Sequence, residues 1–171
     1  MLKLRVRGSL LAFLTVLLIS GAAAGVRAEK PGELESLLQC VKVERSPAGK
    51  ETFSEAREAF PGDLLEYRLA FTNRTSAAVK GLLATIPIPP GTVYVAGSAT
   101  PSVVQASVDG QVFAPVPLMK EQKQPDGTIK KIPVPPEDYR FLRWKLAQLE
   151  VSGTSHMAAR VRVLGPGGRT P

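Results

Sequence analysis

This 171-residue chain is poor in the side chains on which most catalytic and metal sites depend. It contains one cysteine, one histidine and few aromatic residues, which make up 6% of the sequence. One cysteine cannot close a disulfide within the chain, and one histidine with one cysteine cannot supply the ligands of a zinc site. We expect Cys40 to be a small buried side chain, with a disulfide between two chains as the open alternative.

The motifs of other common active sites are also missing. No nucleophile and orienting acid accompany His156, which follows a short polar turn and is expected to be solvated. No glycine-rich phosphate loop follows a strand and opens a helix, and no dense spacing of aspartates predicts calcium. We therefore predict no enzyme, no cofactor and no catalytic or metal-binding residue, and we interpret Asp63 and Asp109 as turn residues.

The one long apolar run lies at the N-terminus. Lys3, Arg5 and Arg7 precede Leu10–Ala24, and Val26-Arg27-Ala28 has the small residues of a cleavage site. Because this run is shorter than the ~20 residues of a membrane span, residues 1–28 are predicted to be a signal peptide. The mature chain is then expected in the periplasm or at the cell surface, without a membrane span; an uncleaved anchor is the alternative.

The basic character of the chain belongs in large part to this N-terminal segment. The formal net charge is +7, but residues 1–28 hold four of the 22 Lys and Arg residues and none of the 15 acidic residues, so the mature charge would be +3. Such a small surplus is poor evidence for nucleic-acid binding. We expect no nucleic-acid partner.

What the sequence does contain is a series of short strands separated by turns. Apolar and polar side chains alternate over Leu65–Phe71, Leu142–Leu146 and Met157–Val163, which predicts strands with one buried face. Pro90-Gly91 fits a type II turn, and Asp109-Gly110 predicts a two-residue hairpin.

We predict an all-β, immunoglobulin-like Greek-key sandwich of about seven to nine strands, preceded by the signal helix. Residues 29–36 are expected to form a polar leader, 37–164 a single domain and 165–171 a flexible tail, while Lys50–Phe60 fits either a short helix or an extended edge. The expected core is Leu65, Tyr67, Leu69, Phe71, Leu83, Tyr94, Leu142, Trp144, Val161 and Val163.

A spaced constellation in the middle of the chain carries a resemblance. It consists of Pro61-Gly62-Asp63, Tyr67, Asn73 and the run Pro89–Ala99, which contains Thr92, Tyr94 and Gly97-Ser98-Ala99. These residues resemble the bacterial conserved-repeat domain known as domain of unknown function eleven. The resemblance covers Leu37 to Leu164 and implies an extracytoplasmic immunoglobulin-like module, often a stalk repeat of large surface proteins. A single copy without a wall-sorting tail favours a small soluble or periplasmic form.

Two basic features are candidates for an interaction surface. The outward residues of the last two strands would form one positive stripe if those strands lie close together in one sheet, and residues 114–138 form a long proline-rich loop that could hold a hairpin around Pro125-Asp126-Gly127. The candidate residues are Arg143, Lys145, Arg160 and Arg162 on the strands, and Lys120, Lys123, Lys130 and Lys131 in the loop.

We predict a non-enzymatic exported module with a structural or interaction role in the bacterial cell envelope, and another envelope protein or an anionic surface polymer as its partner. Two alternatives stay open. A carbohydrate-binding module would need a row of exposed aromatic residues, for which Tyr139 and Phe141 are the only pair. A periplasmic assembly subunit, such as a chaperone or pilus-like protein, would need an incomplete or donated edge strand.

Overall fold

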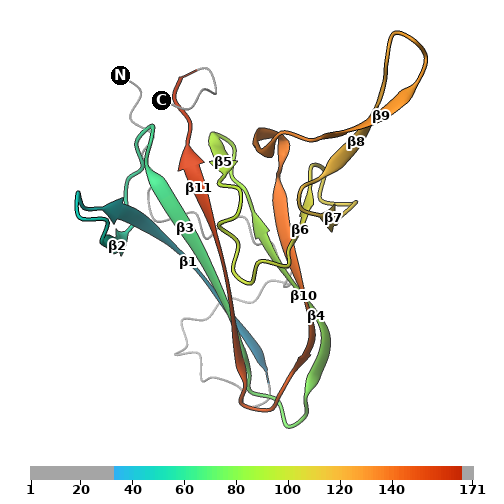
Figure 1. Ribbon diagram of the computed structural model, residues 1–171. Coiled ribbons are helices and arrows are strands. Elements are labelled where there is room, and N and C mark those ends of the chain that lie inside the picture. The colour runs from blue at the N-terminus through green and yellow to red at the C-terminus, as the bar shows by residue number, and fades with distance from the viewer. Residues whose placement is uncertain (1–32, 167–171) are drawn as a thin grey trace, which may run out of the picture.

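The computed structural model describes residues 33–166, which form an all-β chain (Figure 1). The predicted signal peptide, half of the leader and most of the tail lie outside the described residues. The described elements are β1 (Leu34–Arg45), β2 (Glu51–Glu55), β3 (Leu64–Asn73), β4 (Val79–Pro87), β5 (Thr92–Tyr94), β6 (Gln105–Ser107), β7 (Ala114–Pro115), β8 (Met119–Lys123), β9 (Ile129–Pro133), the 3-10 turn η2 (Pro136–Asp138), β10 (Phe141–Leu149) and β11 (Thr154–Val163).

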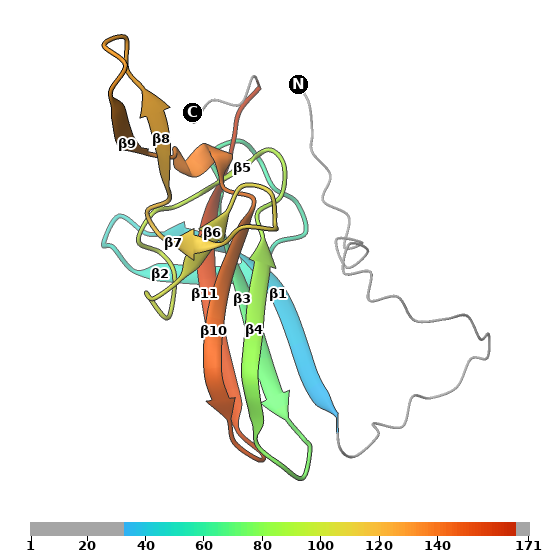
Figure 2. The same cartoon turned by 90° about the vertical axis from the view of Figure 1, so that its right-hand side faces the viewer.

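Nine strands of the described chain form two sheets that face each other, consistent with a β-sandwich (Figure 2). Sheet A has five strands in the order β2-β1-β3-β11-β5, and sheet B has four in the order β4-β10-β6-β7. Strands β8 and β9 pair only with each other and project from one end of the molecule as a two-stranded arm (Figures 1 and 2). The prediction of an all-β chain is confirmed.

The core lies between the two sheets because the predicted alternation sends one side of each strand inward. Tyr67 and Leu69 of β3 lie opposite Ala159 and Met157 of β11, and all four side chains are buried. From sheet B, Trp144 is 2% exposed and donates its Nε1–H to the Pro101 carbonyl at 2.7 Å. The large indole is thus both packed and hydrogen-bonded.

One residue of the expected core is on the wrong side of its strand. Leu83 is 50% exposed on the outward face of β4, whereas Ala84 and Ile86 are buried. Leu82, Leu83 and Ala84 are all apolar, so alternation alone does not choose the inward face, and a shift of one residue exchanges the two faces. Phe71 is only half-buried.

Most of the conspicuous turn residues have structural tasks. Thr92 donates its backbone N–H to the Pro89 carbonyl at 3.2 Å, and Gly91 has a φ of 79°, as the predicted type II turn requires. The Asp63 carboxylate accepts the N–H of Phe60 at 2.8 Å and so closes the Pro61-Gly62 turn.

The two-residue hairpin predicted at Asp109-Gly110 is wrong. Strands β6 and β7 are joined by the longer loop 108–113. The Asp109 carboxylate accepts the backbone N–H groups of Gln111 and Val112 at 2.8 and 3.0 Å. Aspartate side chains can replace backbone turn bonds in this way, and the result here is a wider loop.

The first strand is longer than expected and is only partly covered. β1 begins at Leu34, so the end of the predicted leader belongs to it. It pairs with β3 over Leu34–Val43, but β2 covers its other side only over Val41–Arg45. Cys40 is half-buried opposite Tyr67, and burial raises the pKa of its thiol.

Candidate binding groove

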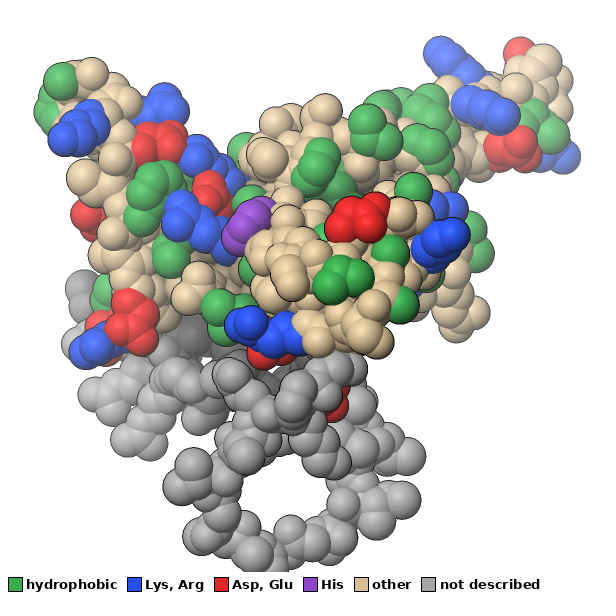
Figure 3. All heavy atoms as spheres, turned by 90° about the horizontal axis from the view of Figure 1, so that it is seen from below, with side chains coloured by type: hydrophobic (Ala, Val, Ile, Leu, Met, Phe, Trp, Pro, Cys, Tyr) green, Lys and Arg blue, Asp and Glu red, His purple; other side chains and the backbone are tan. Residues whose placement is uncertain are grey.

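The outward face of sheet A is hollowed into a groove with a volume of about 1360 Å³. Its floor is made by β3 and β11, one wall by Lys42–Arg45 at the end of β1, and the other by the loop Val95–Thr100 after β5. Figure 3 shows His156, the single histidine, in the hollow beside a wall that carries side chains of both charges.

The cross-strand register determines which side chains form the floor. Residues directly opposite each other on β1, β3 and β11 have side chains on the same face of the sheet. The surface of the groove therefore consists of rows of side chains that run across these three strands. From one end to the other the rows are Leu37–Ala70–His156, Gln39–Arg68–Ala158, Val41–Glu66–Arg160 and Val43–Leu64–Arg162.

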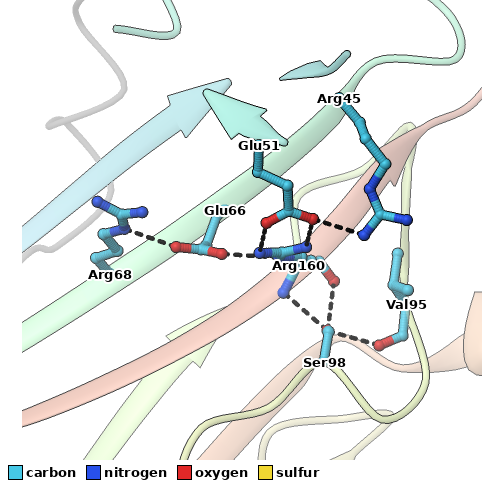
Figure 4. A network of polar contacts seen from close by, with 7 residues as sticks. All are labelled: Arg45, Glu51, Glu66, Arg68, Val95, Ser98 and Arg160. Atoms are coloured by element: carbon cyan, nitrogen blue, oxygen red, sulfur yellow. Dashed lines mark hydrogen bonds and ion pairs between the residues drawn. The ribbon is translucent and has the colours of Figure 1, made fainter. Parts of the chain in front are cut away.

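Arg160 is the centre of an ion-pair network in the middle of the groove (Figure 4). Its two terminal nitrogens donate to the two carboxylate oxygens of Glu51 at 2.9 and 2.8 Å, and its Nε–H donates to Glu66 at 2.7 Å. Glu66 also accepts from Arg68 at 2.6 Å, and Glu51 accepts from Arg45 at 2.8 Å. Both carboxylates are therefore shared between arginines.

This network requires a strongly curved sheet. Glu51 lies on β2 and Arg160 on β11, and β1 and β3 separate these strands. In a flat sheet their backbones would be about 14 Å apart across three steps of about 4.8 Å. Glu51 would also lie four residues along β2 from Glu55, which stands in the row of Val41, Glu66 and Arg160. The 2.8 Å contact means that the β2 edge curls over the outward face, which makes the groove concave.

The arginines lower the pKa of the Glu51 carboxylate on β2. Hydrogen bonds from Arg160, and then from Arg45, hold the pKa of Glu51 at about 2, below its ordinary 4.5. The same contacts raise the pKa of Arg160, with the hydrogen bond to Glu51 the largest cause. The Glu51–Arg160 pair therefore stays ionised through neutral and mildly acidic pH.

The two ends of the groove differ in charge. At one end Arg162 donates to the Gly62 carbonyl at 3.0 Å, and Lys42 lies 3.0 Å from Asp63. The opposite end is formed by the row Leu37–Ala70–His156 and carries no fixed charge. The first end carries Lys42, Arg45 and Arg162 together with Glu44 and Asp63, a surplus of one positive charge, so the groove combines a charged end with an uncharged one.

The loop wall is fixed to β11 by residues of the central constellation. Ser98 donates its hydroxyl to the Val95 carbonyl at 2.6 Å and accepts the backbone N–H of Arg160 at 3.0 Å. Gly97 has a φ of 77°, which suits glycine at this tight reversal. The wall therefore has a defined shape next to the ion pairs.

The structure does not form the single positive stripe. Arg160 and Arg162 lie on β11 in sheet A, whereas Arg143 and Lys145 lie on β10 in sheet B, so their outward faces are opposite faces of the molecule. The Arg143 guanidinium stacks 3.4 Å above the Phe113 ring. The prediction assumed that the last two strands are sheet neighbours, but the chain crosses between sheets at this point.

The basic loop contains the hairpin that Pro125-Asp126-Gly127 suggested. Lys120 pairs with Ile132, Gln122 with Lys130, and Glu121 with Lys131, so the four lysines of the arm divide between its two faces. In the described hairpin, the lysines therefore do not gather on one face. Lysines along both edges of an exposed ribbon instead discourage pairing with other strands.

The two aromatic residues considered for carbohydrate binding are not an exposed pair. Tyr139 is 2% exposed, stacks on Tyr94 with ring centres 6.1 Å apart, and accepts the N–H of Leu118 at 2.9 Å. Phe141 is half-buried beside Phe113. An aromatic platform at this place is ruled out.

Sequence reasoning missed four residues of the network, Arg45 among them. Glu66 and Arg68 were assigned to the wet face of a strand, and the row pattern would have placed them beside Arg160 had the sheet order been known. The contact of Glu51 with Arg160 could not be predicted, because the segment Lys50–Phe60 fits either a short helix or an extended edge.

Comparisons of the chain with protein-family models, with curated proteins and with solved structures give no match. The resemblance to the conserved-repeat domain stays a prediction. Within residues 33–166, no helix has the length and apolarity to cross a bilayer, and no three His, Cys, Asp or Glu side chains gather as metal ligands would.

Proposed function

We propose that this chain is a non-enzymatic, exported, immunoglobulin-like module that binds another protein of the bacterial cell envelope through the groove of sheet A. The observation that carries this proposal is the groove itself, a concave surface with an uncharged end and a charged end where basic residues outnumber acidic ones by one. Concave surfaces with a few convergent polar groups are the usual form of a binding site.

The groove favours an extended acidic segment as its ligand. Its central arginines are largely neutralised by Glu51 and Glu66, so they shape the floor rather than attract a ligand. Arg162, which donates to a backbone carbonyl, and the 68% exposed Arg45, which shares Glu51 with Arg160, supply the positive charge. A carboxylate of the partner would meet these guanidiniums, and its uncharged part would lie toward His156.

The test is binding of a fluorescent oligoglutamate peptide to the mature chain, with an oligoglutamine peptide for comparison. We expect anisotropy to report binding of the acidic peptide that weakens as salt is raised, because exposed charges are screened. Arg162→Glu should abolish this binding. Lys145→Glu, which makes the same charge change on sheet B, should not.

Two results would contradict the proposal. One is binding that is insensitive to salt, and the other is equal binding by the Arg162→Glu and Lys145→Glu variants. Circular dichroism shows whether both variants are folded, and Arg162→Gln provides a milder version of the change.

Export is the second part of the proposal and rests on the N-terminal residues 1–28. We expect the mature chain to begin at Glu29 and to fractionate outside the cytoplasm. Mass spectrometry of the purified protein and fractionation of cells measure both. Recovery of the full-length chain from the cytoplasm would contradict this part and leave the groove test unaffected.

One specific observation favours a second candidate, a periplasmic assembly subunit. Such proteins exchange strands between chains, and β1 has no partner on one side over residues 34–39 within the described chain.

A further inference from the structure

β1 presents an open edge that the rest of the described chain leaves uncovered. β2 pairs with β1 only from Val41 onward, so the stretch Leu34–Cys40 has β3 on one side and no described strand on the other. Leu37 is 57% exposed on the outward face, and Leu38 is 36% exposed on the inward face. This edge therefore has exposed leucines on both sides.

The direction of the backbone groups follows from two hydrogen bonds. The Glu33 carbonyl accepts from Arg74 beyond β3, whereas the Cys40 carbonyl accepts from Ala56 on the β2 side at 3.5 Å. Successive residues of a strand alternate in this respect, and the pairing with β3 has no bulge. The N–H and C=O groups of Leu34, Ser36 and Leu38 therefore point to the open edge.

The other edge strands carry features that block pairing, whereas the one such feature on this stretch is the charge of Glu35, which is paired with Arg74. Such features are short length, charge, proline and kinks from glycine. The open edge has no lysine, proline or glycine between residues 34 and 40. In sheet B, the edge strand β4 contains Lys80, Gly81 and Pro87, and the edge strand β7 has two residues, one of which is Pro115. In sheet A, β5 is only three residues long, and β2 contains Glu51 and Glu55. The arm carries Lys120, Lys123, Lys130 and Lys131.

We propose that a second copy of this chain occupies the edge, so that two β1 strands pair antiparallel and join the two copies of sheet A into one continuous sheet. The midpoint of the open stretch Leu34–Cys40 is Leu37, and a two-fold axis there uses the whole stretch. Ser36 of one copy then pairs with Leu38 of the other, and Leu34 lies opposite Cys40, whose carbonyl also accepts from Ala56 of its own chain at 3.5 Å. The ladder ends where β2 begins.

The side chains of the stretch are self-complementary in this register. The two exposed Leu37 side chains meet across the axis as a close cross-strand pair. Glu35 is the only charged residue of the stretch, and its carboxylate lies 2.6 Å from Arg74. Because Glu35 faces Gln39 of the other copy, no like charges meet. This inference does not depend on the ligand of the groove.

Sedimentation velocity of the mature chain over a concentration series, without added ligand, tests the dimer. We expect the wild type to dimerise, and Leu37→Lys and Leu37→Glu each to raise the dimer dissociation constant by at least about tenfold, because like charges would meet at the axis. An equimolar mixture of these two variants should dimerise again. Only pairing of the chain with itself at Leu37 gives this rescue.

Two further variants sharpen the result. Leu83→Lys changes an exposed leucine on the edge of sheet B and should leave the dimer unchanged. Ser36→Pro removes an N–H that points to the open edge, so it should weaken the dimer while circular dichroism shows the same fold. The proposal is overturned by a wild type that stays monomeric throughout, by a Leu37→Lys dimer as tight as wild type, or by a mixture that stays monomeric.

Discussion

Arg160 shows how one side chain can determine the shape of a surface. Its guanidinium joins β2, β3 and β11 through Glu51 and Glu66, and its backbone N–H holds Ser98 in the loop wall. A bidentate arginine–carboxylate pair has a geometry that lysine cannot reproduce. The side-chain contacts that join these three strands on the outward face therefore depend on this residue.

The ionised Glu51 should make part of the stability pH-dependent. Its pKa of about 2 in the folded chain is below the ordinary 4.5, so its contribution is present above pH 4.5 and is lost as the pH falls toward 2. Glu51→Gln should lower the free energy of unfolding at neutral pH, and the difference from wild type should vanish near pH 2. Urea unfolding across this pH range measures it.

The double-mutant cycle with Arg160→Met provides the control for this prediction. In that background Glu51→Gln should have a much smaller effect, since its main partner is absent. An undiminished effect, or a difference from wild type that persists at the lowest pH, would show that the ion pair is not the cause.

At the scale of elements, the arm is separable from the sandwich. Nearly all residues of β8 and β9 are exposed, and its base is closed by the hydrogen bond from the Val134 N–H to the Leu118 carbonyl at 2.8 Å. An isolated hairpin is at best marginally stable in water. The arm therefore adds little to the core.

Replacing residues 119–133 with a short glycine-containing turn should change the free energy of unfolding by less than about 1 kcal/mol, as expected for surface changes away from the core. Urea denaturation followed by circular dichroism measures this. A loss of several kcal/mol would show that the arm supports the sandwich. Retained recovery of envelope partners by the shortened chain would exclude the arm as their binding segment.

The elements also mark the limit of what the sequence predicts. Some elements could be predicted because the residues that determine them lie close together in the sequence. Examples are the turns at Pro90-Gly91 and Asp63 and the strand Leu65–Phe71. The separation of Arg143 from Arg160 could not be predicted, because it depends on which sheet each strand joins. The groove likewise depends on contacts such as Glu51–Arg160, which are distant in sequence.

At the scale of the molecule, both sheets share one core. Buried residues of sheet A, such as Tyr67 and Val161, belong to the same cluster as Leu142 and Trp144 of sheet B. Neither sheet has a separate apolar centre in the described chain, so the two sheets stabilise each other.

Trp144→Ala should therefore destabilise the whole molecule by about 3–5 kcal/mol, because a large buried side chain is removed and the Pro101 carbonyl loses its donor. Urea unfolding monitored by circular dichroism measures the loss. Leu83→Ala, at an exposed position, is the matched control and should cost less than about 1 kcal/mol. Similar losses for both variants would contradict the core described above.

The solitary histidine of the groove also gives this molecule a built-in spectroscopic probe. With one imidazole in the whole chain, a proton spectrum contains a single pair of histidine ring signals, and they arise from His156 at the uncharged end of the hollow. Titration with any candidate compound would move those two lines when the hollow fills, without labels or substitutions. Compounds that settle on the arm or on sheet B would leave them in place.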